Sequence, residues 1–154
     1  MRFNDLNDAV KAQFSQAIEA QEYTLAIAPF SDFELVKNLD IPKVLVTTGF
    51  QKLQQAKISA LQLEKVFDEI HIDEIDDPER IFKKGIFERL HSRRDLAPHD
   101  YWVVGDNPES ELKAGRELGF TTVQVAKLGQ KKHALTDHCI AHYQELVALL
   151  EVGQ

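Results

Sequence analysis

The sequence holds a single cysteine, Cys139, so no internal disulfide can form and its cysteine content gives no sign of an oxidising compartment. Glycine and proline are also sparse, at 7 and 5 of 154 residues, which argues against a low-complexity or disordered chain. No stretch approaches the roughly 20 apolar residues that a membrane-spanning helix needs. The sequence therefore indicates a globular domain without disulfide staples.

Basic residues are fewer than acidic residues. The chain has 18 Lys and Arg against 25 Asp and Glu, a formal net charge of −7. A general nucleic-acid binder needs basic residues to neutralise phosphates, so we expect no nucleic acid among its partners. The first residues carry acids and amides where a signal peptide has an apolar core. We therefore expect a soluble, cytoplasmic protein that has no membrane partner.

Short apolar runs alternate along the chain with segments of helical periodicity. Strands are predicted around residues 44–46, 66–72, 101–106, 121–126 and 138–141. Helices are predicted for residues 51–60, from Asp77-Pro78, from Pro108 and for residues 143–150. This alternation is typical of βαβ units. We expect an α/β fold, a Rossmann-like three-layer sandwich with a mostly parallel sheet, in which ligands bind beyond the carboxyl ends of the strands.

The N-terminal part has weaker signals. Apolar residues at every fourth position predict a helix that begins near Asn4 or Asp5. Residues 23–28 read either as a strand or as an extended lead-in. Ser31 and Glu34 have the spacing of a capping box, which predicts a short helix that continues to about residue 39.

The strongest candidate for chemistry is the phrase VVGDNPESELKAGRELGF. It places Asp106 directly after a buried strand and Glu111 in the first turn of the next helix. Oxygen ligands of this kind suit a hard cation such as Mg²⁺, and the helix N-terminus adds free N–H groups. The plainer interpretation is a turn residue followed by a favourable first-turn acid.

Two further candidates involve phosphate. In VLVTTG, the hydroxyls of Thr47 and Thr48 and the loop at Gly49 could bind phosphate oxygens, although Thr is also common at strand ends and helix caps. Lys83 and Lys84, in IFKKGIF, could neutralise a phosphoryl group. A lysine on an amphipathic helix is more often simply solvated.

With Thr47, the lysine pair and Asp106/Glu111 in this order, residues 29 to 150 resemble the haloacid-dehalogenase superfamily of phosphatases and related hydrolases. The most specific part is residues 103–125. The resemblance implies a haloacid-dehalogenase-like core over residues 29–154, preceded by a lead-in over residues 1–28 that looks like a remnant of the family's helical cap. It also implies a small phosphorylated substrate and a hydrolytic reaction through an aspartyl-phosphate.

The resemblance gives each candidate a role. Thr47, with Thr48 and Gly49, would hold a phosphoryl oxygen, and Lys83 or Lys84 would neutralise charge on the phosphate and the nucleophile. The spacing leaves open which lysine does so. Asp106 would bind Mg²⁺, and Glu111 would complete or support the metal site.

The family's nucleophile is the missing feature. It normally lies on an apolar strand that ends in D-x-D-x-T, and no such phrase precedes Thr47. The most similar phrase, at residues 3–9, contains Asp5 and Asp8, but Asn7 and Ala9 stand where the second acid and the threonine would be. We interpret it as a capped helix start, so the nucleophile is unknown.

Two hypotheses follow from this absence. Either the sequence is part of a Mg²⁺-dependent phosphatase and is inactive alone, or it is a non-catalytic member used for binding or assembly. A missing central strand would leave backbone groups of its neighbours unpaired. We therefore expect the gap to be filled by residues 23–28, by a second chain, or by the neighbouring strands closing up.

Three weaker alternatives remain. His138, Cys139 and His142 have the identities of zinc ligands, but a strand there would place the first two on opposite faces. The acidic run at residues 73–80 could bind a second cation, although a solvated loop is the plainer interpretation. A phospho-acceptor signalling domain has similar residue types but places its acids before Thr and Lys.

Overall fold

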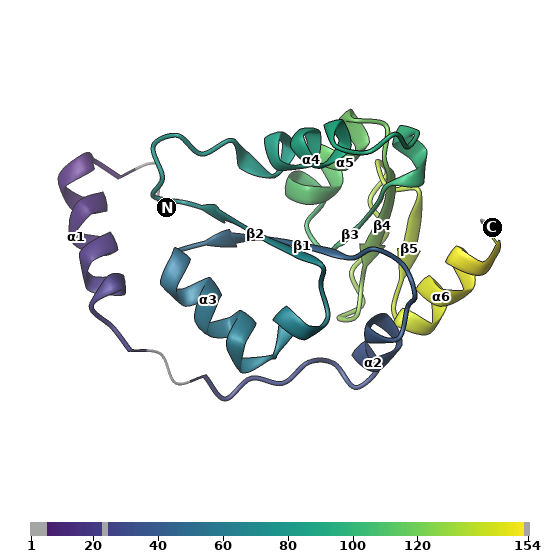
Figure 1. The fold of residues 1–154 in the computed structure, drawn as a ribbon, viewed down its shortest axis with the longest axis horizontal. Helices are drawn as coiled ribbons and strands as arrows, with labels where there is room; N and C mark the ends of the chain where they lie inside the picture. Colours follow the sequence, from purple (N-terminus) through teal and green to yellow (C-terminus); the bar gives the residue numbers. More distant parts are fainter. Residues whose placement is uncertain (1–5, 23–24, 153–154) are drawn as a thin grey trace. The chain divides into compact units, whose positions relative to one another are not determined.

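The fold is that of a computed structural model, which describes residues 6–22 and 25–152. Helices and strands alternate along the chain (Figure 1), and the predicted α/β class is confirmed. The strands are β1 (Val44–Gly49), β2 (Glu69–Glu74), β3 (Trp102–Gly105), β4 (Thr121–Val125) and β5 (His138–Ile140). The helices are α1 (Asp8–Glu19), α2 (Phe33–Lys37), α3 (Gln51–Ala60), α4 (Phe82–Ser92), α5 (Lys113–Glu117) and α6 (Tyr143–Val152), with single turns η2 (Leu63–Lys65), η3 (Pro98–Asp100) and η4 (Pro108–Leu112).

All strand pairs in the described part of the chain are parallel, as predicted. They form a two-stranded sheet, β1–β2, and a three-stranded sheet in the order β3–β4–β5. The chain divides accordingly into two compact units. The first contains the chain up to Pro29 and Ile41–Phe82, and the second contains Phe30–Asp40 and the chain from Lys83 onwards.

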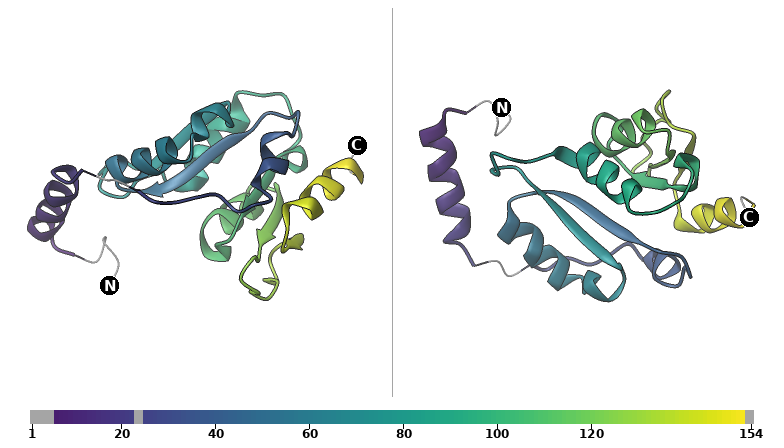
Figure 2. Two further views of the ribbon diagram at one scale, coloured as in Figure 1. Left: turned by 90° about the horizontal axis from the view of Figure 1, so that it is seen from below. Right: turned by 45° about the horizontal axis from the view of Figure 1, so that its top comes forward.

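The first unit is built on β1 and β2. Their register runs from Val44 opposite Glu69 to Gly49 opposite Glu74, so both strands end at the same edge. Helix α3 runs alongside this pair (Figure 2) and buries Ile58, which is 2% exposed. The predicted bounds of α3 are confirmed, because Gly49 ends the strand and Phe50 caps the helix.

The second unit is centred on β4. Val123 has no exposed surface, and it packs with Ile140 of β5 and Leu146 of α6 to form a small apolar core. Leu112, which is 1% exposed, and Thr122, which has no exposed surface, are also fully buried. Because the three strands are parallel and adjacent, the loops that follow them lie along one edge.

Helix α4 begins at Phe82, four residues after the Pro78 start that the Asp77-Pro78 signal predicts. Asp77 accepts a hydrogen bond from the N–H of Glu79 at 2.8 Å, which closes a turn instead of starting the helix. The backbone then passes through Phe82 at a φ of +57°, in the left-handed region that a bulky residue rarely adopts. This conformation separates the turn from the helix.

The N-terminal predictions are partly wrong. The cap of α1 is Asn7, whose side chain accepts from the N–H of Val10 at 2.9 Å, and Asn4 and Asp5 lie outside the described residues. The N-cap residue of α2 is Asp32, one position after the predicted Ser31, and its side chain makes no capping bond.

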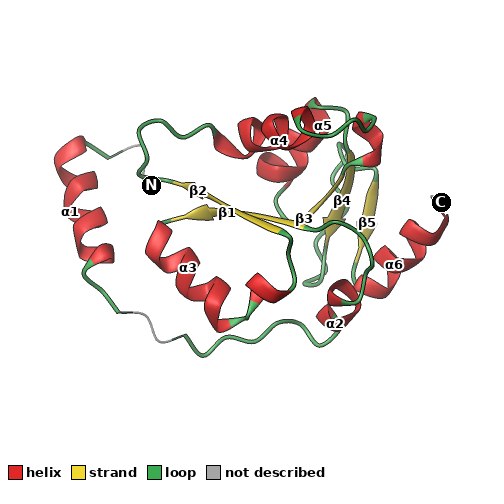
Figure 3. Cartoon of the chain, in the orientation of Figure 1, coloured by secondary structure: helices red, strands yellow, loops and turns green. Residues whose placement is uncertain are grey.

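The described residues of the 23–28 segment contain no strand. Residues 25–30 are loop (Figure 3), so they do not supply a strand beside β1 or β3. The assignment of residues 1–28 to a cap remnant and of 29–154 to a core stays a prediction. Among the described residues, the helices are all too short or too polar to cross a membrane.

Candidate functional site

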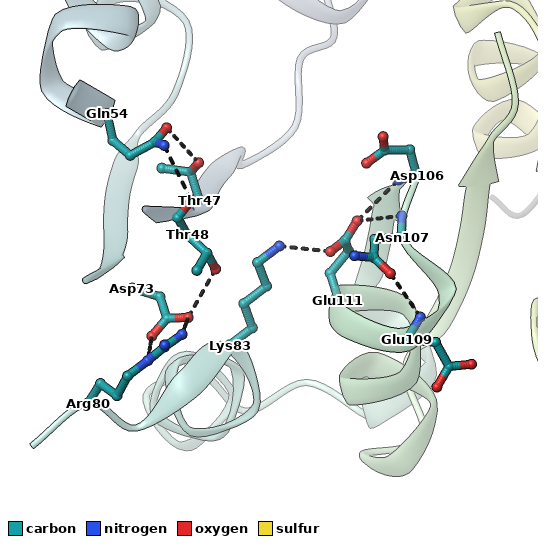
Figure 4. Close-up of polar contacts among 10 residues, drawn as sticks. All are labelled: Thr47, Thr48, Gln54, Asp73, Arg80, Lys83, Asp106, Asn107, Glu109 and Glu111. Carbon is teal, nitrogen blue, oxygen red and sulfur yellow. Dashed lines mark hydrogen bonds and ion pairs between the residues drawn. The ribbon is translucent and has the colours of Figure 1, made fainter. Parts of the chain in front are cut away.

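Asp106 occupies the position that the sequence indicates, at the carboxyl end of β3. It is exposed, and among the described residues no hydrogen bond is donated to its carboxylate (Figure 4). The next residue, Asn107, caps η4 by accepting from the N–H of Glu109 at 3.0 Å. The chain therefore turns immediately after the strand, and this turn leaves the Asp106 carboxylate free.

Glu111 has a different environment. Its Oε1 accepts hydrogen bonds from the N–H groups of Asp106 at 3.1 Å and Asn107 at 2.9 Å. Its Oε2 accepts from Nζ of Lys83 at 2.7 Å. With three donors already on the carboxylate, Glu111 holds the turn that carries Asp106 in place.

The electrostatics of Glu111 reflect two opposing effects. Burial alone would raise its pKa, since only 10% of its side chain is exposed. The hydrogen bonds from Lys83 and from the N–H of Asn107 outweigh burial and lower the pKa below its ordinary value. The carboxylate is therefore held in its charged form next to the turn.

Gly105, the last residue of β3, is needed for this arrangement. A Cβ atom at this position would overlap Oε1, Cγ and Cδ of Glu111. Only glycine lets the carboxylate approach the turn so closely. The dipeptide Gly105-Asp106 is thus explained by the packing of Glu111 as well as by the turn.

The two candidate lysines differ in their surroundings. The Lys83 side chain is 16% exposed and pairs with Glu111. The Lys84 side chain is 47% exposed and pairs with Glu117 at 2.8 Å, and this hydrogen bond raises the pKa of Lys84. In the second unit, Lys83 thus contacts the turn after β3, and Lys84 lies on the surface.

At the carboxyl end of β1, Thr47 and Thr48 are both hydrogen-bonded. Thr47 donates its hydroxyl to Oε1 of Gln54 at 3.1 Å, and Nε2 of Gln54 donates to the Thr48 carbonyl at 3.2 Å. A Cβ at Gly49 would overlap the Gln54 amide, so this glycine makes room for it. Sequence reasoning missed Gln54, because a glutamine on an amphipathic helix carries no signal of burial.

Thr48 belongs to a second network that the sequence did not indicate. Its hydroxyl donates to Oδ2 of Asp73 at 2.9 Å. Arg80 forms a bidentate pair with the same carboxylate, Nε to Oδ1 at 3.0 Å and Nη2 to Oδ2 at 2.5 Å. The Arg80 guanidinium also lies 4.3 Å from the ring centroid of Phe82, the residue with positive φ. This network fixes the loop after β2.

The weaker metal candidates gain no geometric support. In the described part of the chain, no group of three or more His, Cys, Asp or Glu is placed to hold a metal ion. His138 stacks its ring on Trp102, with centroids 5.8 Å apart. In the acidic run, both carboxylate oxygens of Asp73 accept hydrogen bonds from Arg80. Burial raises the pKa of Glu74, and the charges of Asp76 and Asp77 raise it further.

In each unit, hydroxyl or carboxylate side chains lie at the carboxyl ends of parallel strands, which is the edge at which α/β proteins bind ligands. Residues 78–148 match the model of the HAD-hydrolase-like family. No curated protein matches the chain.

Several solved structures have a similar fold. The HAD-hydrolase YfnB from Bacillus subtilis, described as bound to magnesium, is 18% identical with a TM-score of 0.68, over 92% of this chain and 62% of that one. A HAD phosphatase from Thermococcus onnurineus is 25% identical with a TM-score of 0.53, over 64% and 46%. L-2-haloacid dehalogenase from Xanthobacter autotrophicus is 15% identical with a TM-score of 0.66, over 96% and 68%.

The chain thus resembles the haloacid-dehalogenase (HAD) superfamily over residues 78–148, and its fold is similar to that of HAD hydrolases. The chain spans 62% of YfnB and 46% of the Thermococcus phosphatase. Both a phosphatase and a dehalogenase occur among the similar structures, so the shared fold does not by itself define a reaction or a substrate.

Proposed function

We propose that the chain carries part of the site of a Mg²⁺-dependent phosphatase that acts on a small phosphorylated metabolite. The observation that supports this most is Asp106. It is an exposed carboxylate without a hydrogen bond from the described residues, on a turn that a buried Lys83–Glu111 pair holds in place. A carboxylate held in this way is preorganised to bind a cation.

The residues at this turn fit Mg²⁺. This ion takes one or two carboxylates and fills its other positions with water and substrate phosphate. Asp106 would supply the carboxylate, and Glu111 would support it through the turn, since its own oxygens are already bonded. The bound ion would neutralise charge that develops on the phosphoryl oxygens.

The other candidates have separate proposed roles. Thr47 would turn its hydroxyl from Gln54 to a phosphoryl oxygen, with the N–H groups around Gly49 as further donors. Lys83 would place positive charge near the reacting phosphate while it remains bonded to Glu111. Lys84 remains a candidate for the same role, with a less buried side chain.

The nucleophile is proposed to come from a polypeptide segment outside the sequence given. Within the described residues, β1 pairs with β2 alone and β3 pairs with β4 alone, so each has an edge with no strand partner. An edge strand presents a row of unpaired N–H and C=O groups to which a further strand can bond. An extended segment that ends in D-x-D-x-T could pair with one of these strand edges. It would also supply the aspartate nucleophile.

Hydrolysis of a small aryl phosphate in the presence of Mg²⁺ tests this function. We expect no turnover by the chain alone and measurable turnover when a peptide with an apolar strand ending in D-x-D-x-T is added. Asp106→Asn should lower that turnover by about 100-fold or more, since a charge that stabilises the transition state is lost. Glu109→Gln, which removes an exposed acid from the same turn, is the matched control.

Equal turnover in the Asp106→Asn and Glu109→Gln variants would contradict the proposed role of Asp106. Turnover by the chain alone would contradict an external nucleophile. The second candidate function is non-catalytic binding, which the absence of D-x-D-x-T from the sequence favours. Mg²⁺ binding at Asp106 without turnover under any of these conditions would support it.

A further inference from the structure

Asp32 joins three distant parts of the chain. Its two carboxylate oxygens accept hydrogen bonds from Nζ of Lys127 at 2.8 and 2.7 Å. Oδ2 also accepts from the backbone N–H of Tyr143 at 2.8 Å. Lys127 and Tyr143 lie 95 and 111 positions further along the chain. We call Asp32, Lys127 and Tyr143 the clasp.

Lys127 is buried in the clasp. Its side chain is 9% exposed, and its Nζ lies 4.9 Å from the ring centroid of Phe30 and 4.4 Å from that of Tyr143. The same Nζ lies 3.4 Å from the carbonyl of Ala141. The hydrogen bond from Lys127 and the one from the Tyr143 N–H lower the pKa of Asp32. The Lys127 end of the pair is therefore largely shielded from water, while the Asp32 side chain remains 21% exposed.

The clasp lies at the edge that carries Asp106. Lys127 follows β4, Tyr143 follows β5 and Asp106 follows β3, and these three strands are adjacent and parallel. Burial raises the pKa of Tyr143, and the charges of Asp32 and Asp106 raise it further. Geometry and electrostatics thus place the clasp and Asp106 at one edge of this sheet.

The clasp also explains an irregularity in how the chain divides. Phe30–Asp40 belongs to the second unit, although the chain on both sides of it belongs to the first. Asp32 is the residue of this segment that forms hydrogen bonds with Lys127 and Tyr143, and Phe33 adds an edge-on contact with the Tyr143 ring at 6.2 Å. The segment leads, after three more residues, into β1, which begins at Val44.

We propose that Asp32 and Lys127 are positioning residues. They hold residues 30–40 at the edge of the β3–β4–β5 sheet that also carries Asp106. The fastening follows from contacts alone, and its importance for catalysis rests on the function proposed above.

Backbone hydrogen exchange of residues 33–39 tests this directly. We expect faster exchange in Lys127→Met than in the parent chain, because the segment loses its bond to Lys127. Lys127→Arg should restore the parent rate, because a guanidinium can also bond both oxygens of Asp32.

Arg116→Gln is the matched control, because it breaks a more exposed ion pair, with Asp137, in the same unit. Asp32→Asn is the second clasp variant, and hydrogen exchange across β4 verifies that each variant is folded. Exchange of residues 33–39 should be about tenfold faster in the clasp variants and unchanged in the control. Parent-like exchange in both folded clasp variants would overturn the proposal, as would equally fast exchange in Arg116→Gln.

Tyr143 supplies a local signature of the clasp. With Tyr23→Phe and Tyr101→Phe, ultraviolet titration of tyrosinate reports Tyr143 alone. Asp32→Asn should then lower the pKa of Tyr143, because it removes one of the charges that raise it. An unchanged titration would mean that Asp32 does not hold its place beside Tyr143. None of these measurements requires turnover, so their failure is distinguishable from failure of the proposed phosphatase activity.

Discussion

Glu111→Ala is expected to lower the free energy of unfolding of the second unit by about 3 kcal/mol or more, because it breaks a buried ion pair from one side. The Lys83 ammonium, whose side chain is 16% exposed, would lose its acceptor. The N–H groups of Asp106 and Asn107 would lose theirs as well. Urea denaturation followed by the fluorescence of Trp102, the only tryptophan, measures the effect in this unit.

The control for this variant is Glu117→Ala, which breaks the exposed pair with Lys84 and should leave the urea midpoint nearly unchanged.

The pH dependence of stability gives a second readout. Because the folded-state pKa of Glu111 lies below its ordinary value of 4.5, its contribution is fully present above that pH and is lost as pH falls through the folded pKa. Glu111→Ala should therefore flatten the acid limb of the stability curve. Equal midpoints for Glu111→Ala and Glu117→Ala would contradict the central position of Glu111 in the turn.

Asp73→Ala is expected to destabilise the first unit by a similar amount, about 3 kcal/mol, because it leaves a buried guanidinium unpaired. The Asp73 side chain is 3% exposed and that of Arg80 is 13% exposed. The hydroxyl of Thr48 would also lose its acceptor. Hydrogen exchange of α3 and β1 measures the loss in this unit, which contains no tryptophan.

A double-mutant cycle with Arg80→Met separates the pair from other effects. The double variant should be less destabilised than the sum of the single variants, because neither buried charge then remains alone. Asp8→Ala, at an exposed acid in the same unit, is the control and should have no measurable effect. Additive losses in the cycle would show that Asp73 and Arg80 do not act as a pair.

Sequence reasoning was reliable where local signals agreed. The apolar run at residues 44–46 and the break at Gly49 predicted β1 and α3 correctly. The turn after β3 was located because an acid directly after a buried strand must lie at the carboxyl edge of a parallel sheet. The start of α4 was missed because the contacts of Asp77 with Glu79 and of Arg80 with Asp73 override the local Asp-Pro signal.

Long-range pairs could not be predicted in this way. Asp32 was not expected to contact Lys127, because residues 95 positions apart share no spacing that a single sequence reveals. Glu111 illustrates a different limit. Its position in the first turn of a helix suits a metal ligand, but in the folded chain its oxygens are already bonded to the turn and to Lys83. Residue identity predicts which groups can bind a cation, and the packing around each group determines how many lone pairs remain for it.

The most direct test of the proposed site is a crystal structure with Mg²⁺ and a tetrahedral phosphate mimic. We predict a Mg²⁺ ion about 2.1 Å from a carboxylate oxygen of Asp106, the usual distance for this ion. The Glu111 carboxylate should remain bonded to the turn and to Lys83. An ion bound elsewhere at saturating Mg²⁺, with the Asp106 carboxylate uncoordinated, would contradict the proposed metal site.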